Sequence, residues 1–72
     1  YGAVDPNVAT SLVNVAMVME RRGELQGAWH AYVTARDVFV KLGVENSHRG
    51  LRAACRSIEA IELLIESGKQ KD

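Results

Sequence analysis

The sequence has a single cysteine and no excess of either charge, and each of these two features excludes a class of protein. One cysteine cannot form an internal disulfide, which excludes a disulfide-stapled scaffold and suits a reducing compartment. Nine basic and nine acidic residues give a formal net charge of zero, so no broad positive field can attract nucleic acid or an anionic membrane. No apolar run approaches the ~20 residues of a membrane span. We therefore expect a cytoplasmic protein that neither binds nucleic acid nor inserts into a membrane.

The chemistry of an active site is also missing from the sequence. Catalysis needs a nucleophile with a base, paired carboxylates in a pocket or a metal cluster. Two histidines and one cysteine fall short of the four ligands of a structural zinc site, and Cys55 lies on an apolar stripe as a small core residue does. The carboxylates are expected on solvated faces or at helix caps: Glu20, Glu24, Glu59, Glu62 and Glu66. We predict a protein that is not an enzyme and has no cofactor or metal.

What the chain does contain is a helical pattern from end to end. Its 72 residues fit one small all-α domain, with helices predicted over about 6–22, 24–42 and 47–67. Start and stop signals set these bounds, because aspartate and an early proline favour a helix start and glycine favours a helix end. The start signals are Asp5, Pro6, Asn46 and Ser47, and the stop signals are Gly23, Gly43 and Gly68.

The apolar residues of each predicted helix recur every three or four positions and predict its buried face. In the first helix the inward set is Val8, Leu12, Val15, Ala16 and Met19, which leaves Val13, Met17 and Val18 outside the stripe. The second helix should bury Leu25, Ala28, Trp29, Tyr32, Ala35, Phe39 and Leu42. The third should bury Leu51, Ala54, Cys55, Ile58, Ile61, Leu64 and Ile65.

Small residues within these stripes indicate how the first two helices meet. Ala16, Ala28 and Ala35 stand where a larger side chain would force two helices apart, and bulkier residues between them fill the gaps. The short connections favour antiparallel neighbours. This pattern predicts a helix hairpin followed by a third antiparallel helix.

The amino-acid sequence of the predicted hairpin resembles a tetratricopeptide repeat of the long kinesin-light-chain type, over about residues 4–45. The residues that carry the resemblance are Asp5-Pro6-Asn7-Val8-Ala9-Thr10-Ser11-Leu12-Val13-Asn14-Val15-Ala16, then Gly23, Ala28, Tyr32 and Ala35. Such repeats form arrays that bind proteins, so the resemblance implies a non-catalytic interaction module or scaffold. It also implies that the chain is a fragment or terminal part of a longer array. The next repeat opening, at 43–46, lacks its proline, so we interpret the third helix as a capping helix.

The resemblance also implies a binding site for a peptide or a partner helix. In such repeats the first helix lines a concave groove, and the asparagine matching Asn14 holds the backbone of an extended peptide. An amide can donate and accept at once, which suits a peptide bond. The residues that the resemblance places in the groove are Thr10, Val13, Asn14, Met17 and Arg21.

Two other interpretations remain open at this stage. Length and the alanine-rich hairpin also resemble a microtubule-interacting-and-trafficking-type three-helix bundle, which binds peptide motifs between its helices. A purely structural domain could instead self-associate or cap a larger array through exposed apolar positions. The stripe formed by Arg49, Arg52 and Arg56 is expected to be a solvated face paired with Glu45 and Glu59, and His48 a surface residue.

Overall fold

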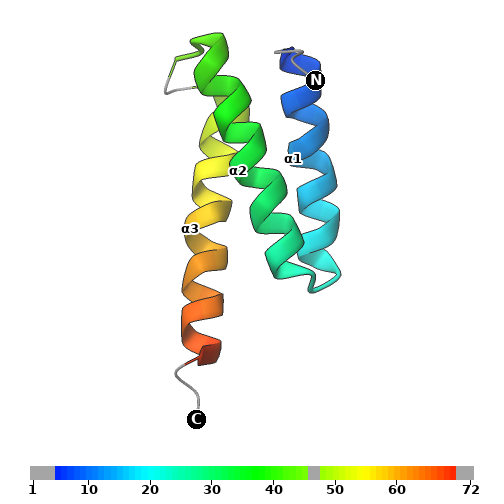
Figure 1. The fold of residues 1–72 in the computed structure, drawn as a ribbon, viewed down its shortest axis with the longest axis vertical. Coiled ribbons are helices and arrows are strands. Elements are labelled where there is room, and N and C mark those ends of the chain that lie inside the picture. The colour runs from blue at the N-terminus through cyan, green and yellow to red at the C-terminus, as the bar shows by residue number, and fades with distance from the viewer. Residues whose placement is uncertain (1–4, 46–47, 70–72) are drawn as a thin grey trace.

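The chain forms three α-helices and no β-strand over residues 5–45 and 48–69, which are the residues that the computed structural model describes. The helices are α1 (Pro6–Arg21), α2 (Leu25–Leu42) and α3 (Arg49–Lys69). Consecutive helices run in opposite directions (Figure 1). α2 contacts both of its neighbours extensively, whereas α1 and α3 contact each other much less. The predicted all-α, antiparallel three-helix architecture is confirmed, with helix ends that differ by at most two residues from the predicted ones.

Local signals in the sequence set the start of α1 and the ends of α1 and α2. The Asp5 side chain accepts a hydrogen bond from the backbone N–H of Asn7 at 2.8 Å, and Pro6 occupies the first turn. At the other end of α1, Gly23 has a φ of 83°, and the N–H of Glu24 donates to the carbonyl oxygen of Met19 at 2.9 Å. This left-handed glycine closes a Schellman motif, which satisfies the last carbonyls of the helix. Gly43 ends α2 in the same conformation, with a φ of 74°.

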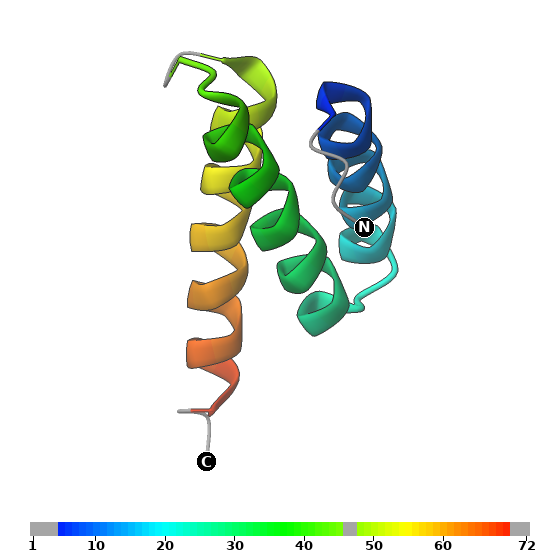
Figure 2. The ribbon, with the colours of Figure 1, turned by 45° about the horizontal axis from the view of Figure 1, so that its top comes forward.

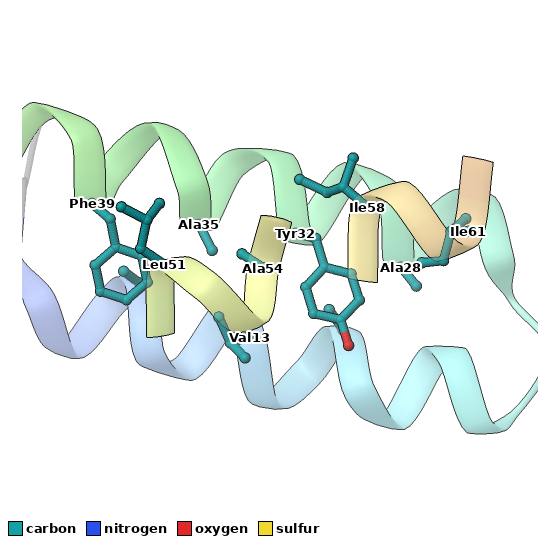
Figure 3. Packing of buried hydrophobic residues seen from close by; sticks show 11 residues of the cluster. Val13, Ala28, Tyr32, Ala35, Phe39, Leu51, Ala54, Ile58 and Ile61 are labelled. Atoms are coloured by element: carbon teal, nitrogen blue, oxygen red, sulfur yellow. The ribbon is translucent and has the colours of Figure 1, made fainter. Parts of the chain in front are cut away.

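One hydrophobic core joins all three helices (Figure 3). α2 supplies its centre with Ala28, Tyr32, Ala35 and Phe39, all of which are fully buried as predicted. α1 contributes Ala9, Val13 and Ala16, and α3 contributes Leu51, Ala54, Ile58 and Ile61. None of the three helices, in the ranges given above, is long and apolar enough to cross a membrane.

α1 turns a partly different face to this core from the predicted one, because three of the five predicted residues pack against the core and two do not. Val8 and Val15, expected to point inward, are 41% and 49% exposed, whereas Val13, expected outside the stripe, is only 7% exposed. The prediction was wrong for these valines because it assigned the buried face by the larger apolar side chains and not by alanine. Close approach of two helices needs short side chains at the contact, so α1 presents Ala9 and Ala16 to the core, and Val13 lies between them on the same face.

α3 extends past the end of the α1–α2 hairpin, as Figures 1 and 2 show. Its last turns therefore have less of α2 to pack against. Leu64, predicted to be buried, is 54% exposed, while Ile65 remains half-buried. Gly68 was predicted to end this helix and instead lies within it.

His48 precedes α3 and caps its start, a role that was not predicted for it. The N–H of Gly50 donates to His48 Nδ1 at 3.1 Å, and the His48 ring lies on the Phe39 ring with centroids 4.8 Å apart. The predicted caps Asn46 and Ser47 lie outside the described residues. His48 therefore satisfies one free N–H of α3 while fixing the start of that helix against the end of α2.

Candidate functional site

A groove of 430 Å³ lies between α1 and α3, with α2 beneath it. α1 supplies one wall and α3 the other, while Tyr32 of α2 forms the floor. The lining residues are Val13, Met17, Glu20, Tyr32, Ala53, Arg56, Ser57 and Ala60. We call this feature the α1–α3 groove. It exists because α1 and α3 both pack on α2 but barely touch each other.

The floor of the groove is a hydrogen-bonded tyrosine. Tyr32 is 1% exposed, and its hydroxyl donates to Glu20 Oε1 at 2.9 Å. A buried tyrosine hydroxyl needs such a partner, and Glu20 on the last turn of α1 provides it. The aromatic ring thus fills the core, while its polar end binds the two helices together (Figure 3).

Burial raises the pKa of the Tyr32 hydroxyl above its ordinary value of 10.0. The phenolate loses hydration in this position, and desolvation disfavours a charged form. A hydrogen bond with the Ser57 side chain lowers the pKa, whereas the hydrogen bond and negative charge of Glu20 raise it. The floor of the groove therefore carries the neutral hydroxyl of Tyr32, which lies between Glu20 of the α1 wall and Ser57 of the α3 wall.

One edge of the groove is basic. Arg56 belongs to the groove and also to a smaller hollow of 280 Å³ that is lined by Arg49, Arg52, Ala53 and Arg56. All three arginines are exposed. The predicted pairing of this stripe with Glu59 is absent from the described part of the chain, where the ion pairs join Arg22 to Glu24 and Arg36 to Asp37. The guanidinium groups are thus free to meet an external partner.

The structure places two of the five predicted site residues in this groove. Val13 and Met17 line it, with Met17 43% exposed. Asn14 is exposed on the same helix, and its amide forms no hydrogen bond with any residue of 5–45 or 48–69. Thr10 and Arg21 are also exposed on α1 but do not line the groove.

Sequence reasoning missed most of the groove. Glu20 was predicted to be a solvated or capping carboxylate, yet it is half-buried and accepts from Tyr32. The α3 wall was missed entirely. A signal for it was present, because Ala53, Ser57 and Ala60 are small residues that recur at spacings of four and three along α3.

A second hollow, of 330 Å³, lies along the contact of α2 with α3. Its residues are Gln26, Trp29, His30, Glu62, Ile65 and Glu66. The indole N–H of Trp29 donates to Glu62 Oε2 at 3.0 Å, so Glu62 is also more than the solvated carboxylate that was predicted. This hydrogen bond links the N-terminal part of α2 to the C-terminal half of α3.

Comparisons with known proteins leave the family of the chain undetermined. No protein-family model, no curated protein and no solved structure matches the sequence or the fold. Within the described ranges, no three histidine, cysteine, aspartate or glutamate side chains gather in a way that could hold a metal ion. The groove geometry therefore carries the functional argument.

Proposed function

We propose that this chain is a non-catalytic protein-interaction module of tetratricopeptide type, which binds an extended peptide or a partner helix in the α1–α3 groove. The observation that carries the proposal is the groove itself. It joins an apolar wall at Val13 and Met17 to a basic edge at Arg56, over a buried tyrosine floor. Apolar contact with a few well-placed polar groups is the general composition of a binding site.

The open arrangement of the helices supports the repeat-like interpretation over the microtubule-interacting bundle. In a closed three-helix bundle each helix would contact the other two to a similar extent. Here α2 lies between its neighbours, and α1 and α3 make few contacts across the groove. An open layer of this kind leaves one side hollow for a ligand.

The surroundings of Asn14 support a peptide ligand. Its amide is exposed on α1, within one helical turn of Val13 and Met17. An amide without a protein partner has both donor and acceptor available for a peptide backbone. Met17 offers a flexible apolar contact beside it, which suits ligand side chains of varied shape.

Selection from a displayed peptide library against the whole chain tests this function. We expect enriched peptides that bind the wild-type protein and lose at least about tenfold in affinity, about 1.4 kcal/mol, when Ala60→Trp fills the groove. Ala60 is exposed and lines the groove, so the variant should still fold.

The matched control is Ser67→Trp, which adds the same bulk to the same helix at an exposed position outside the groove. It should leave peptide affinity unchanged. Enriched peptides that bind wild type and Ala60→Trp equally well would place the binding site elsewhere and remove the basis of the proposal.

A structural role is the second candidate, and the surface of α1 favours it. From Pro6 to Met19 this helix has no charged residue, and Val8, Val15 and Val18 are between 41% and 52% exposed. Asn7, Val8, Ser11, Leu12 and Val15 enclose a shallow hollow of 330 Å³ on this face. In this role, α1 would pack against a neighbouring helix of a longer array.

A further inference from the structure

The outer face of α3 carries opposite charges on its two halves. Six residues follow one another at spacings of three and four, so they form a single stripe along the helix. These residues are Arg49, Arg52, Arg56, Glu59, Leu63 and Glu66, and all six are exposed. We call them the α3 stripe. The three arginines occupy its first half, and the two glutamates with the leucine occupy its second half.

The stripe is complementary to itself when it is turned end for end. A two-fold axis placed between Ser57 and Ile58 brings residues at equal distances from that point level with each other. Arg56 of one copy then lies level with Glu59 of a second copy, and Arg49 with Glu66. The remaining pair joins Arg52 to Leu63, where the aliphatic stem of an arginine can cover an apolar side chain. All six residues thus meet a suitable neighbour in one register.

Within residues 5–45 and 48–69, no ion pair involves a charged residue of the stripe. Across the described residues the two ion pairs lie elsewhere, at Arg22 with Glu24 and at Arg36 with Asp37. Leu63 is 72% exposed, the highest value among the exposed large hydrophobic residues. Figures 1 and 2 show α3 at one flank of the molecule, with α2 on its inner side and α1 beyond α2. A second molecule can therefore approach the outer side.

We propose that the partner of the α3 stripe is a second copy of this chain, bound through antiparallel pairing of the two α3 helices about a two-fold axis. Such isologous contacts place each patch against itself, which requires a self-complementary surface. Exposed ion pairs are individually weak and are screened by salt. The dimer is consequently weak and salt-sensitive, and it shares one residue, Arg56, with the α1–α3 groove.

Charge reversal gives a direct test by sedimentation equilibrium of the whole chain. One variant combines Arg49→Glu and Arg56→Glu, which leaves Arg52 as the one basic residue of the stripe. A second combines Glu59→Arg and Glu66→Arg, which makes it basic. Each variant alone should sediment as a monomer at concentrations up to about 1 mM, because like charges now face each other. Their equimolar mixture should form a heterodimer at low salt with an association similar to that of wild type, because opposite charges again lie level at the same four pairs.

The mixture also distinguishes this register from other modes of association. All four substitutions are at exposed positions, and circular dichroism should show unchanged helix content. A further control, Lys41→Glu, reverses an exposed charge on α2. This variant should have the same sedimentation mass as the wild-type protein at each concentration. A mixture that remains monomeric at low salt would overturn the proposal. So would an acidic or basic variant that self-associates as the wild type does.

Discussion

The two contacts of α2 are built from different side chains. The buried residues of α1 are two alanines and a valine, and Leu12 and Met19 pack partly buried against the core beside them. Toward α3, the core is filled by Leu51, Ile58 and Ile61. The first contact is the more extensive of the two. Short side chains let helix backbones approach closely, whereas large ones hold them apart and gain from hydrophobic burial. The α1–α2 hairpin therefore depends mainly on the close packing of short side chains. The position of α3 depends mainly on the apolar surface that its large side chains bury.

The largest expected loss in the free energy of unfolding follows from a substitution in the α2–α3 contact. Ile61→Ala removes a fully buried side chain and leaves a cavity, which should lower the free energy of unfolding by about 2–5 kcal/mol. Urea denaturation followed by circular dichroism measures the change. Leu63→Ala, two residues away and 72% exposed, should change it by less than about 0.5 kcal/mol. Equal effects of the two substitutions would contradict the assignment of the buried face of α3.

The α1–α2 contact should be destabilised by the opposite change, which is the enlargement of a small buried side chain. Ala16→Leu adds three carbons at a fully buried position, and the resulting overpacking should cost about 1–3 kcal/mol of the free energy of unfolding. Ala53→Leu makes the same change at an exposed position on α3 and should be close to neutral. Thermal melting of both variants provides the comparison. A neutral Ala16→Leu would mean that α1 and α2 do not approach closely.

The smallest effect concerns Tyr32, which contributes to both contacts. Tyr32→Phe removes the hydrogen bond to Glu20 and should lower the free energy of unfolding by about 1 kcal/mol at neutral pH. The wild-type protein should also lose stability at alkaline pH. Its unfolded chain releases the Tyr32 proton near pKa 10.0, while the folded chain, with its raised pKa, retains it to higher pH.

This alkaline loss begins as the pH rises past 10.0, because only the unfolded state then gains from ionisation. In Tyr32→Phe the loss should be smaller, since that group no longer titrates. Urea denaturation of both proteins at neutral and alkaline pH measures the difference. Identical alkaline slopes for the two proteins would show that Tyr32 does not contribute to the pH dependence.

The parts of the fold that the sequence predicts are those governed by neighbouring residues. Asp5 and Pro6 start α1, and Gly23 and Gly43 end helices, because each effect acts within one turn of the chain. The buried face of α2 was also predicted correctly, since this helix is covered on two sides and its apolar stripe is broad. Local signals therefore recovered three helices and their order.

The remaining features depend on how the helices meet in space. The rotation of α1 follows from the alanine contact with α2, so Val8 and Val15 could not be placed by periodicity alone. Leu64 is exposed because α3 extends past the end of the α1–α2 hairpin. The length of this extension depends on how the helices are placed relative to one another. The pairing of Tyr32 with Glu20 joins residues on different helices. For the same reason the α3 wall of the groove was missed, although Val13 and Met17 on the opposite wall were anticipated.

The hydrogen bond between Trp29 and Glu62 has a practical consequence for experiments on this protein. Trp29 is the only tryptophan, and it donates a hydrogen bond to Glu62 near the C-terminal end of α3. Its fluorescence consequently monitors whether that end is docked, while circular dichroism monitors total helix. If the end of α3 detaches before the hairpin melts, the two signals will change at different denaturant concentrations. The chain thus contains an intrinsic optical probe that can time the opening of its last helix without any added label.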